Sequence, residues 1–162
     1  MEANRVGNRG GNIAYSRAAL RQAQITGHYN EWQAQNNVQF SIDGVFGTLA
    51  PVDNQGFTAG HTAITGCNVC FFAIWVNNTN VVSTTQGPIV DPANLTGGTA
   101  KDVVYFPDVV DGKVLLGLLK IKVGGGGSGN QTFTPGTTNL NATNITATFY
   151  DTTVMPVKPL QS

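Results

Sequence analysis

The feature that most limits the possible folds is the run VCFFAIWV at residues 69–76, which is almost continuously apolar. It is rich in aromatic and β-branched side chains and is followed by the turn residues Asn77-Asn78. A short apolar run of this kind predicts a central strand, buried on both faces or lying at an oligomer interface. The segment NVVSTT (80–85) after the turn predicts a neighbouring strand.

Several other segments alternate between apolar and polar residues or are rich in β-branched ones. The turn Asp43-Gly44 separates two of them and predicts a hairpin. In another, Lys120 and Lys122 alternate with apolar residues, which predicts one polar and one buried face. The further expected strands are VQFSI (38–42), VFGTL (45–49), VVYF (103–106), KVLLGLLKIKV (113–123) and ITATFYD (145–151). Many short strands with regular turn signals predict a mainly β fold, a β-sandwich or jelly-roll-like domain.

The N-terminal region has a different composition from the rest of the chain. It holds all 4 arginines and both glutamates, and its first 13 residues are broken by glycines, so we expect an extended arm. The segment SRAALRQAQ (16–24) predicts a short helix that begins at Ser16 and ends before Gly27. The expected division is an arm with a short helix at 1–36, a β-sandwich domain at 37–153 and a C-terminal tail at 154–162.

The low charge of the chain argues against several classes of partner. Charged residues make up 11% of the sequence and the formal net charge is zero. Such a surface gives no general attraction to nucleic acid, although basic arms of some β-sandwich coat proteins bind RNA. No run of about 18 apolar residues is present, so no membrane-spanning helix is expected. A weakly charged surface also favours self-association.

Few residues point to catalysis or metal binding. Cys67-x-x-Cys70 is the sharpest motif, but a zinc ribbon would need a second cysteine pair, and the chain has only 2 cysteines. His61 and His28 could complete a ligand set, yet their spacing does not support one. A redox CxxC normally opens a helix, whereas a strand-like run follows here. We therefore expect no enzyme activity, no cofactor and no bound metal.

A resemblance adds to this interpretation. The elements FPDVVDGK, LLGLLKIKV, FTPGTTNL and ITATFYD within residues 101–151 resemble segments of structural proteins encoded beside capsid genes in tailed bacteriophages. The layout of a polar arm and a β domain rich in Thr, Asn and Gly is similar to that of capsid decoration (cement) proteins of short-tailed phages, including those of cyanobacteria. The resemblance implies a homotrimer on the outside of the capsid, where neighbouring capsomers meet, with no catalytic residues.

The expected function is therefore that of a non-enzymatic virion protein at the capsid surface. It would bind the major capsid protein and itself, as a homotrimer, with no nucleic acid and no membrane as partners. Arginine and bulky aromatic residues are favoured at protein interfaces. The expected capsid-binding residues are Arg5, Arg9, Arg17, Arg21, Tyr29 and Trp32.

Two alternatives stay open. One is a receptor- or glycan-binding head module of a phage fibre or tail, which would need Tyr105, Tyr150 or Trp75 to be exposed. The other is a minor coat protein.

Overall fold

The computed structural model describes residues 12–91, 106–108, 110–124 and 131–151. Every regular element in these ranges is a strand, so the fold is mainly β, as expected. The strands are β1 (Ile13–Ala14), β2 (Leu20–Gln22), β3 (Trp32–Ala34), β4 (Val38–Ile42), β5 (Val45–Leu49), β6 (Val52–Gln55), β7 (Ile64–Thr65), β8 (Val69–Asn77), β9 (Val82–Gln86), β10 (Lys113–Val123), β11 (Thr132–Phe133) and β12 (Ile145–Asp151).

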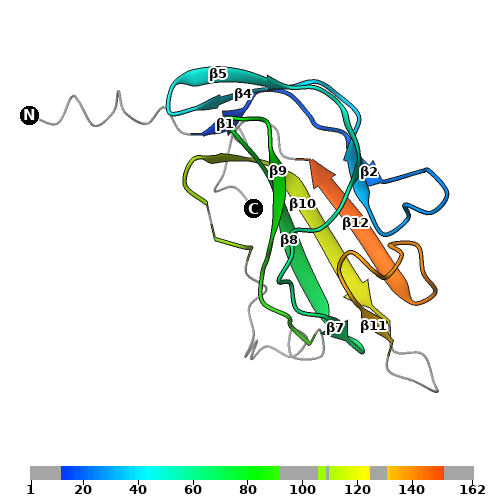
Figure 1. Cartoon of the computed structure of the whole chain (residues 1–162). Helices are drawn as coiled ribbons and strands as arrows, with labels where there is room; N and C mark the ends of the chain where they lie inside the picture. The colour runs from blue at the N-terminus through cyan, green and yellow to red at the C-terminus, as the bar shows by residue number, and fades with distance from the viewer. Residues whose placement is uncertain (1–11, 92–105, 109, 125–130, 152–162) are drawn as a thin grey trace, which may run out of the picture.

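The largest unit is a four-stranded antiparallel sheet in the order β12-β10-β8-β9, called the central sheet below. It runs diagonally through the molecule in Figure 1. Strand β8 is buried on both faces, since Phe72 and Ile74 on one side and Ala73 and Trp75 on the other are all inaccessible. The prediction of a central strand from the apolar run is therefore confirmed.

The end of β10 shows the alternation that its sequence predicts. Leu119, Ile121 and Val123 are fully buried in the core, whereas Lys122 is exposed and Lys120 half-buried on the opposite face. Nearer the start of β10 the register against β8 shifts between Leu115 and Gly117. An irregularity of this kind locally bends a strand, and Leu20 lies against Gly117 at this point.

Strands β1, β4 and β5 form a second sheet in the order β1-β4-β5, called the hairpin sheet. The β4–β5 hairpin has its predicted turn, with Ile42 paired to Val45 and φ of 51° at Asp43 and 81° at Gly44. Two consecutive left-handed residues are what a tight type I′ hairpin turn requires, and Asp-Gly is a favoured pair there. The hairpin is therefore confirmed in position and register.

The hairpin sheet and a third sheet, β2-β3-β6, together cover one face of the central sheet. Strands β1 and β4 contact β10, and β2 contacts β12. The Leu20 amide donates to Oδ1 of Asp151 at 2.9 Å and joins the two layers. Between the layers lie the largest buried side chains, which are Trp32, Phe40, Phe72 and Phe133. A small β7–β11 ribbon closes one end of this core, at the bottom of Figure 1.

The predicted helix at 16–24 is wrong. Residues 20–22 instead form β2, paired with β3, and Ala19 has a φ of 51°, which no right-handed helix accommodates. Ser16 does not cap a helix, because its hydroxyl bonds the Asn37 carbonyl and the Gln39 amide. Helix propensity was overridden here by strand pairing and by burial of the apolar side chains.

The expected arm is also shorter than 36 residues. From Ile13 onward the chain contributes three strands to the two smaller sheets, so residues 13–34 are part of the β fold. Residues 1–11 and 154–162 lie outside the described residues, as does most of the expected strand VVYF (103–106). Phe106, its last residue, belongs to no strand.

Candidate functional site

Four of the six residues expected to bind a capsid lie in the described part of the chain, and their environments differ. Arg5 and Arg9 lie outside the described residues. Arg17 and Arg21 are exposed, but without a helix they do not share a helical face. Arg21 lies opposite Gln33 in the β2–β3 pair. With the Gln33 amide oxygen turned toward the guanidinium, Nε and Nη2 donate to it at 2.7 and 2.9 Å, so Arg21 is held against its own sheet.

The two expected aromatic anchors lie in different environments. Trp32 is fully buried in β3 and packs within the core, so it does not stand free for a partner. Its indole Nε1 has no hydrogen-bond partner among the described residues. Tyr29 is half-buried in the loop before β3, and its carbonyl accepts from the Leu140 amide at 2.8 Å and from Gln22 Nε2 at 3.0 Å. Of the two, only Tyr29 retains accessible surface.

Among the described residues, the most exposed aromatic side chain lies elsewhere, at the end of the hairpin sheet. Val45 is 68% exposed, Phe46 77% and Tyr15 43%. These three residues are called the hairpin-tip patch. Sequence reasoning missed it, although the alternation of VFGTL places Phe46 on the same face as Thr48, away from the buried Leu49. An aromatic residue on the polar face of a strand was the available signal.

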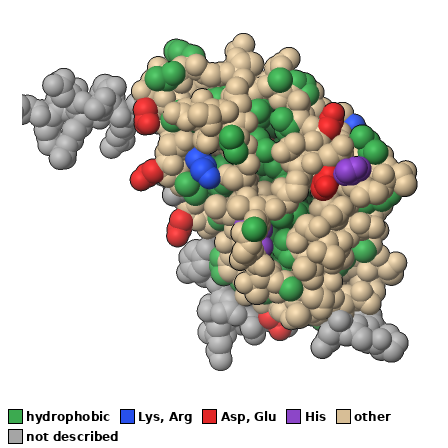
Figure 2. All heavy atoms as spheres, viewed as in Figure 1, with side chains coloured by type: hydrophobic (Ala, Val, Ile, Leu, Met, Phe, Trp, Pro, Cys, Tyr) green, Lys and Arg blue, Asp and Glu red, His purple; other side chains and the backbone are tan. Residues whose placement is uncertain are grey.

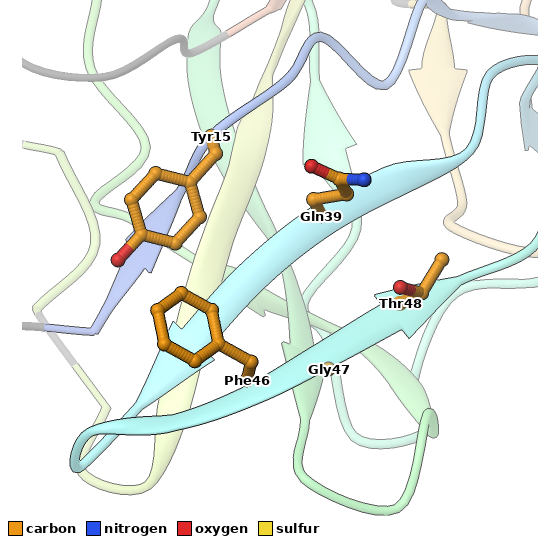
Figure 3. Close-up of a pocket in the computed structure, with 5 residues that line it drawn as sticks. All are labelled: Tyr15, Gln39, Phe46, Gly47 and Thr48. Carbon is orange, nitrogen blue, oxygen red and sulfur yellow. The ribbon is translucent and has the colours of Figure 1, made fainter.

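The patch has a defined geometry. The Tyr15 and Phe46 rings stack across β4, with centroids 5.8 Å apart and planes inclined by 27°. With Gln39, Gly47 and Thr48 they line a shallow pocket of about 590 Å³. Figure 3 shows the two rings at one end of this pocket and the polar side chains farther along β4 and β5. Its lining therefore combines two aromatic faces with an amide and a hydroxyl, and carries no charge.

The N-terminal segment joins the fold beside this patch. Oδ1 of Asn12, the first described residue, accepts a hydrogen bond at 3.1 Å from the amide of Asp43 in the hairpin turn. The turn at Asp43-Gly44 leads directly into Val45 and Phe46 of β5. The chain therefore enters the described fold, at Asn12, beside the exposed apolar surface, and the segment before Asn12 contains Arg5 and Arg9 in its sequence.

A second aromatic group lies on the central sheet, on the face opposite the core. Phe71 contacts Phe106 at 5.3 Å and Tyr150 at 6.4 Å between ring centroids. Phe106 and Tyr150 are exposed, whereas Trp75 is buried and donates from Nε1 to the Thr85 hydroxyl at 2.7 Å. Of the aromatic residues that a glycan-binding head would need, Tyr150 is thus accessible, Trp75 is not, and Tyr105 lies outside the described residues.

The cysteines and histidines do not converge. Cys67 is exposed in a turn, while Cys70 is buried in β8, where its thiol donates to the Gly87 carbonyl at 3.2 Å. Burial raises the pKa of Cys70 to about 11. His28 pairs with Glu31 at 2.8 Å, and His61 bonds the Thr84 hydroxyl at 2.8 Å. Among the described residues, no group of three or more His, Cys, Asp or Glu side chains could hold a metal ion.

No family model, no curated protein and no solved structure matches the chain. Its surface is the remaining guide to function. Figure 2 shows a mostly uncharged face, with apolar side chains gathered over the β4–β5 hairpin at the upper left. The described residues also contain no helix long and apolar enough to cross a membrane.

Proposed function

We propose that this chain is a capsid decoration protein of a tailed bacteriophage. It binds the major capsid protein on the outer surface of the shell and stabilises the shell by bridging coat subunits. It assembles as a homotrimer and performs no catalysis. The observation that carries the proposal is the hairpin-tip patch, an exposed apolar surface placed beside the attachment point of an arginine-containing segment.

The chemistry of the patch suits docking on a protein surface. Exposed aromatic side chains supply much of the binding energy at interfaces, and arginine is enriched with them. Phe46 projects from a tight hairpin whose backbone is already ordered, so little conformational entropy is lost when it binds. A neutral body built from paired strands suits a protein that is bound in many copies to a rigid shell.

A capsid-binding assay tests the proposal directly. Purified capsids lacking this protein would be mixed with the full chain, and bound protein measured by co-sedimentation over a range of concentrations. Replacement of Phe46 by Ser should weaken binding by about 2 kcal/mol, or roughly 30-fold in Kd, if the ring is a central contact. Val81→Ser is the matched control, because Val81 is 57% exposed at a different turn.

The role of the N-terminal segment is tested separately. Deleting residues 1–11 leaves every described strand in place, so the truncated protein should fold and bind capsids more weakly. If the deletion variant and Phe46→Ser both bound capsids as tightly as the wild type, the proposal that this end of the molecule docks on the capsid would be contradicted. A deletion of residues 1–36 would be uninformative, because it removes β1, β2 and β3 together with the buried Trp32.

Glycan binding is the second candidate, and the pocket at the patch favours it. A sugar ring can stack on the Tyr15 and Phe46 faces while the Gln39 amide and Thr48 hydroxyl bond its hydroxyl groups. Titration of the labelled protein with a panel of neutral oligosaccharides, followed by NMR, distinguishes the candidates. Saturable shifts confined to Tyr15, Gln39 and Thr48, together with no capsid binding, would favour the glycan-binding module.

A further inference from the structure

Strand β5 forms one edge of the hairpin sheet, since the strand order is β1-β4-β5. Only one side of β5 is therefore paired, with β4. An edge strand offers its unpaired amide and carbonyl groups to any second strand of suitable shape. The hairpin register determines which backbone groups of β5 lie along this edge.

The register shows which backbone groups of β5 point away from β4. Ile42 and Val45 flank the two-residue turn and exchange hydrogen bonds, and in an antiparallel pair every second residue pair then does the same. Phe40–Gly47 and Val38–Leu49 are thus bonded pairs, while Phe46 and Thr48 direct their amides and carbonyls outward. The opposite strand agrees with this phase, because the Gln39 carbonyl and amide bond Tyr15 and Ser16 on the β1 side.

Nothing in the described part of the chain occupies this edge. No hydrogen bond from another described segment reaches the outward groups of Phe46 and Thr48. Proteins normally protect such edges with lysine, proline or a bulge. Residues 45–49 contain no charge and no proline, and five consecutive residue pairs join β4 to β5 without a bulge. At the centre of the strand, Gly47 has no side chain, and the Phe40 ring fills the space that one would need.

We propose that β5 pairs in antiparallel fashion with β5 of a second copy of this chain, about a two-fold axis at Gly47. Phe46 of one copy then lies opposite Thr48 of the other, and their outward amides and carbonyls bond one another. Val45 lies opposite Leu49 of the second copy, which covers an apolar side chain that is 68% exposed in the single chain.

The occupant is a second copy because β5 is complementary to itself. The same pairing satisfies the outward groups of both strands at once, which a two-fold contact requires. No charged residue lies within either strand, so no like charges are brought together across the pair. The zero net charge of the chain adds no long-range repulsion between copies.

The pairing has a consequence for the function proposed above, and only this consequence rests on that function. A two-fold axis perpendicular to the sheet joins two hairpin sheets into one and keeps the stacked Tyr15 and Phe46 rings of both copies on the same face. Two such ring pairs on one face would let a joined pair contact two coat subunits at once, which raises avidity without new contacts. In a trimeric protein, the same edge would link two trimers.

The mass of the full-length protein in solution, measured by light scattering across a concentration series, tests the pairing. The wild type should associate. Phe46→Lys places a charge at the edge, so this variant should have half the mass of the wild type, whereas Val81→Lys should have the wild-type mass. Thr48→Pro, which removes an outward amide, should act like Phe46→Lys, and Thr48→Val should associate like the wild type. A monomeric wild type, or edge variants with the wild-type mass, would overturn the proposal.

Amide hydrogen exchange locates the contact and remains informative if a variant fails to fold. In the associated protein the Phe46 and Thr48 amides should be protected, and dilution to the dissociated form should remove their protection. The Gly47 amide, bonded to β4 in either state, should stay protected and serves as the internal control. An oligomer whose Phe46 and Thr48 amides exchange freely would place self-association elsewhere and refute this pairing, whatever the outcome of the capsid assay.

Discussion

Replacement of Trp32 tests whether this residue stabilises the core or serves as an anchor for capsid binding. The side chain is fully buried in the core, and truncation of a buried Trp to Ala typically costs about 3–5 kcal/mol. The indole Nε1 is buried without a partner among the described residues, and an unsatisfied buried donor costs about 1–3 kcal/mol, which the truncation relieves. We therefore expect Trp32→Ala to lower the free energy of unfolding by about 3 kcal/mol, the lower end of that range.

Trp32→Phe is the matched variant. It keeps a ring in the core and removes the unpaired donor, so the free energy of unfolding should change by less than about 1 kcal/mol. Urea unfolding followed by far-ultraviolet circular dichroism measures both variants without relying on the fluorescence of the replaced indole. A loss below about 1 kcal/mol for Trp32→Ala would refute the assignment to the core. So would a stable Trp32→Phe protein that no longer binds capsids.

Three further predictions concern the packing and the ionisable groups. Gly117→Ala should destabilise the fold by about 3 kcal/mol or more, because the added Cβ would meet the backbone of β12. Gly56→Ala is the control and should cost little, because open space surrounds Gly56. Equal urea midpoints for the two variants would contradict this. Cys67 should react with a thiol reagent in the native protein, and Cys70 only after unfolding. Elemental analysis should find no stoichiometric zinc. Rapid reaction of both thiols in the native protein would refute the burial of Cys70. Burial lowers the pKa of His61, so the unfolded chain binds a proton more readily and stability should fall as pH drops below about 6.5; a His61→Gln protein with the same pH dependence would contradict that assignment.

The strands that could be predicted from sequence are those whose hydrophobic pattern matches their burial in the fold. The run at 69–76 lies between neighbours on both sides of the central sheet, and its continuous apolarity reflects that position. Residues 113–123 form a strand with the predicted bounds, and the turn at Asp43-Gly44 fixes the hairpin register through its left-handed residues. Local chemistry and tertiary structure agree at these places, so a single sequence was sufficient.

The failures arise where tertiary contacts override local preference. Residues 16–24 contain good helix formers, yet Leu20 and Ala23 are buried and β2 pairs with β3. Trp32 was expected to be accessible because its neighbours are polar, but Gln33 beside it is buried as well. Pairing among β2, β3 and β6 joins distant segments, which no local window contains. Phe46 is a different case, because the alternation of residues 45–49 already places its ring on the face opposite the buried Leu49.

The central claim, that the protein decorates a capsid, is tested most directly by the composition of purified phage particles. Quantitative mass spectrometry would give the copy number of this chain relative to the major capsid protein. A decoration protein should be present in numbers comparable to the coat subunits and in a fixed ratio to them. Absence from the particles, or only the few copies expected of a tail or vertex component, would contradict the account.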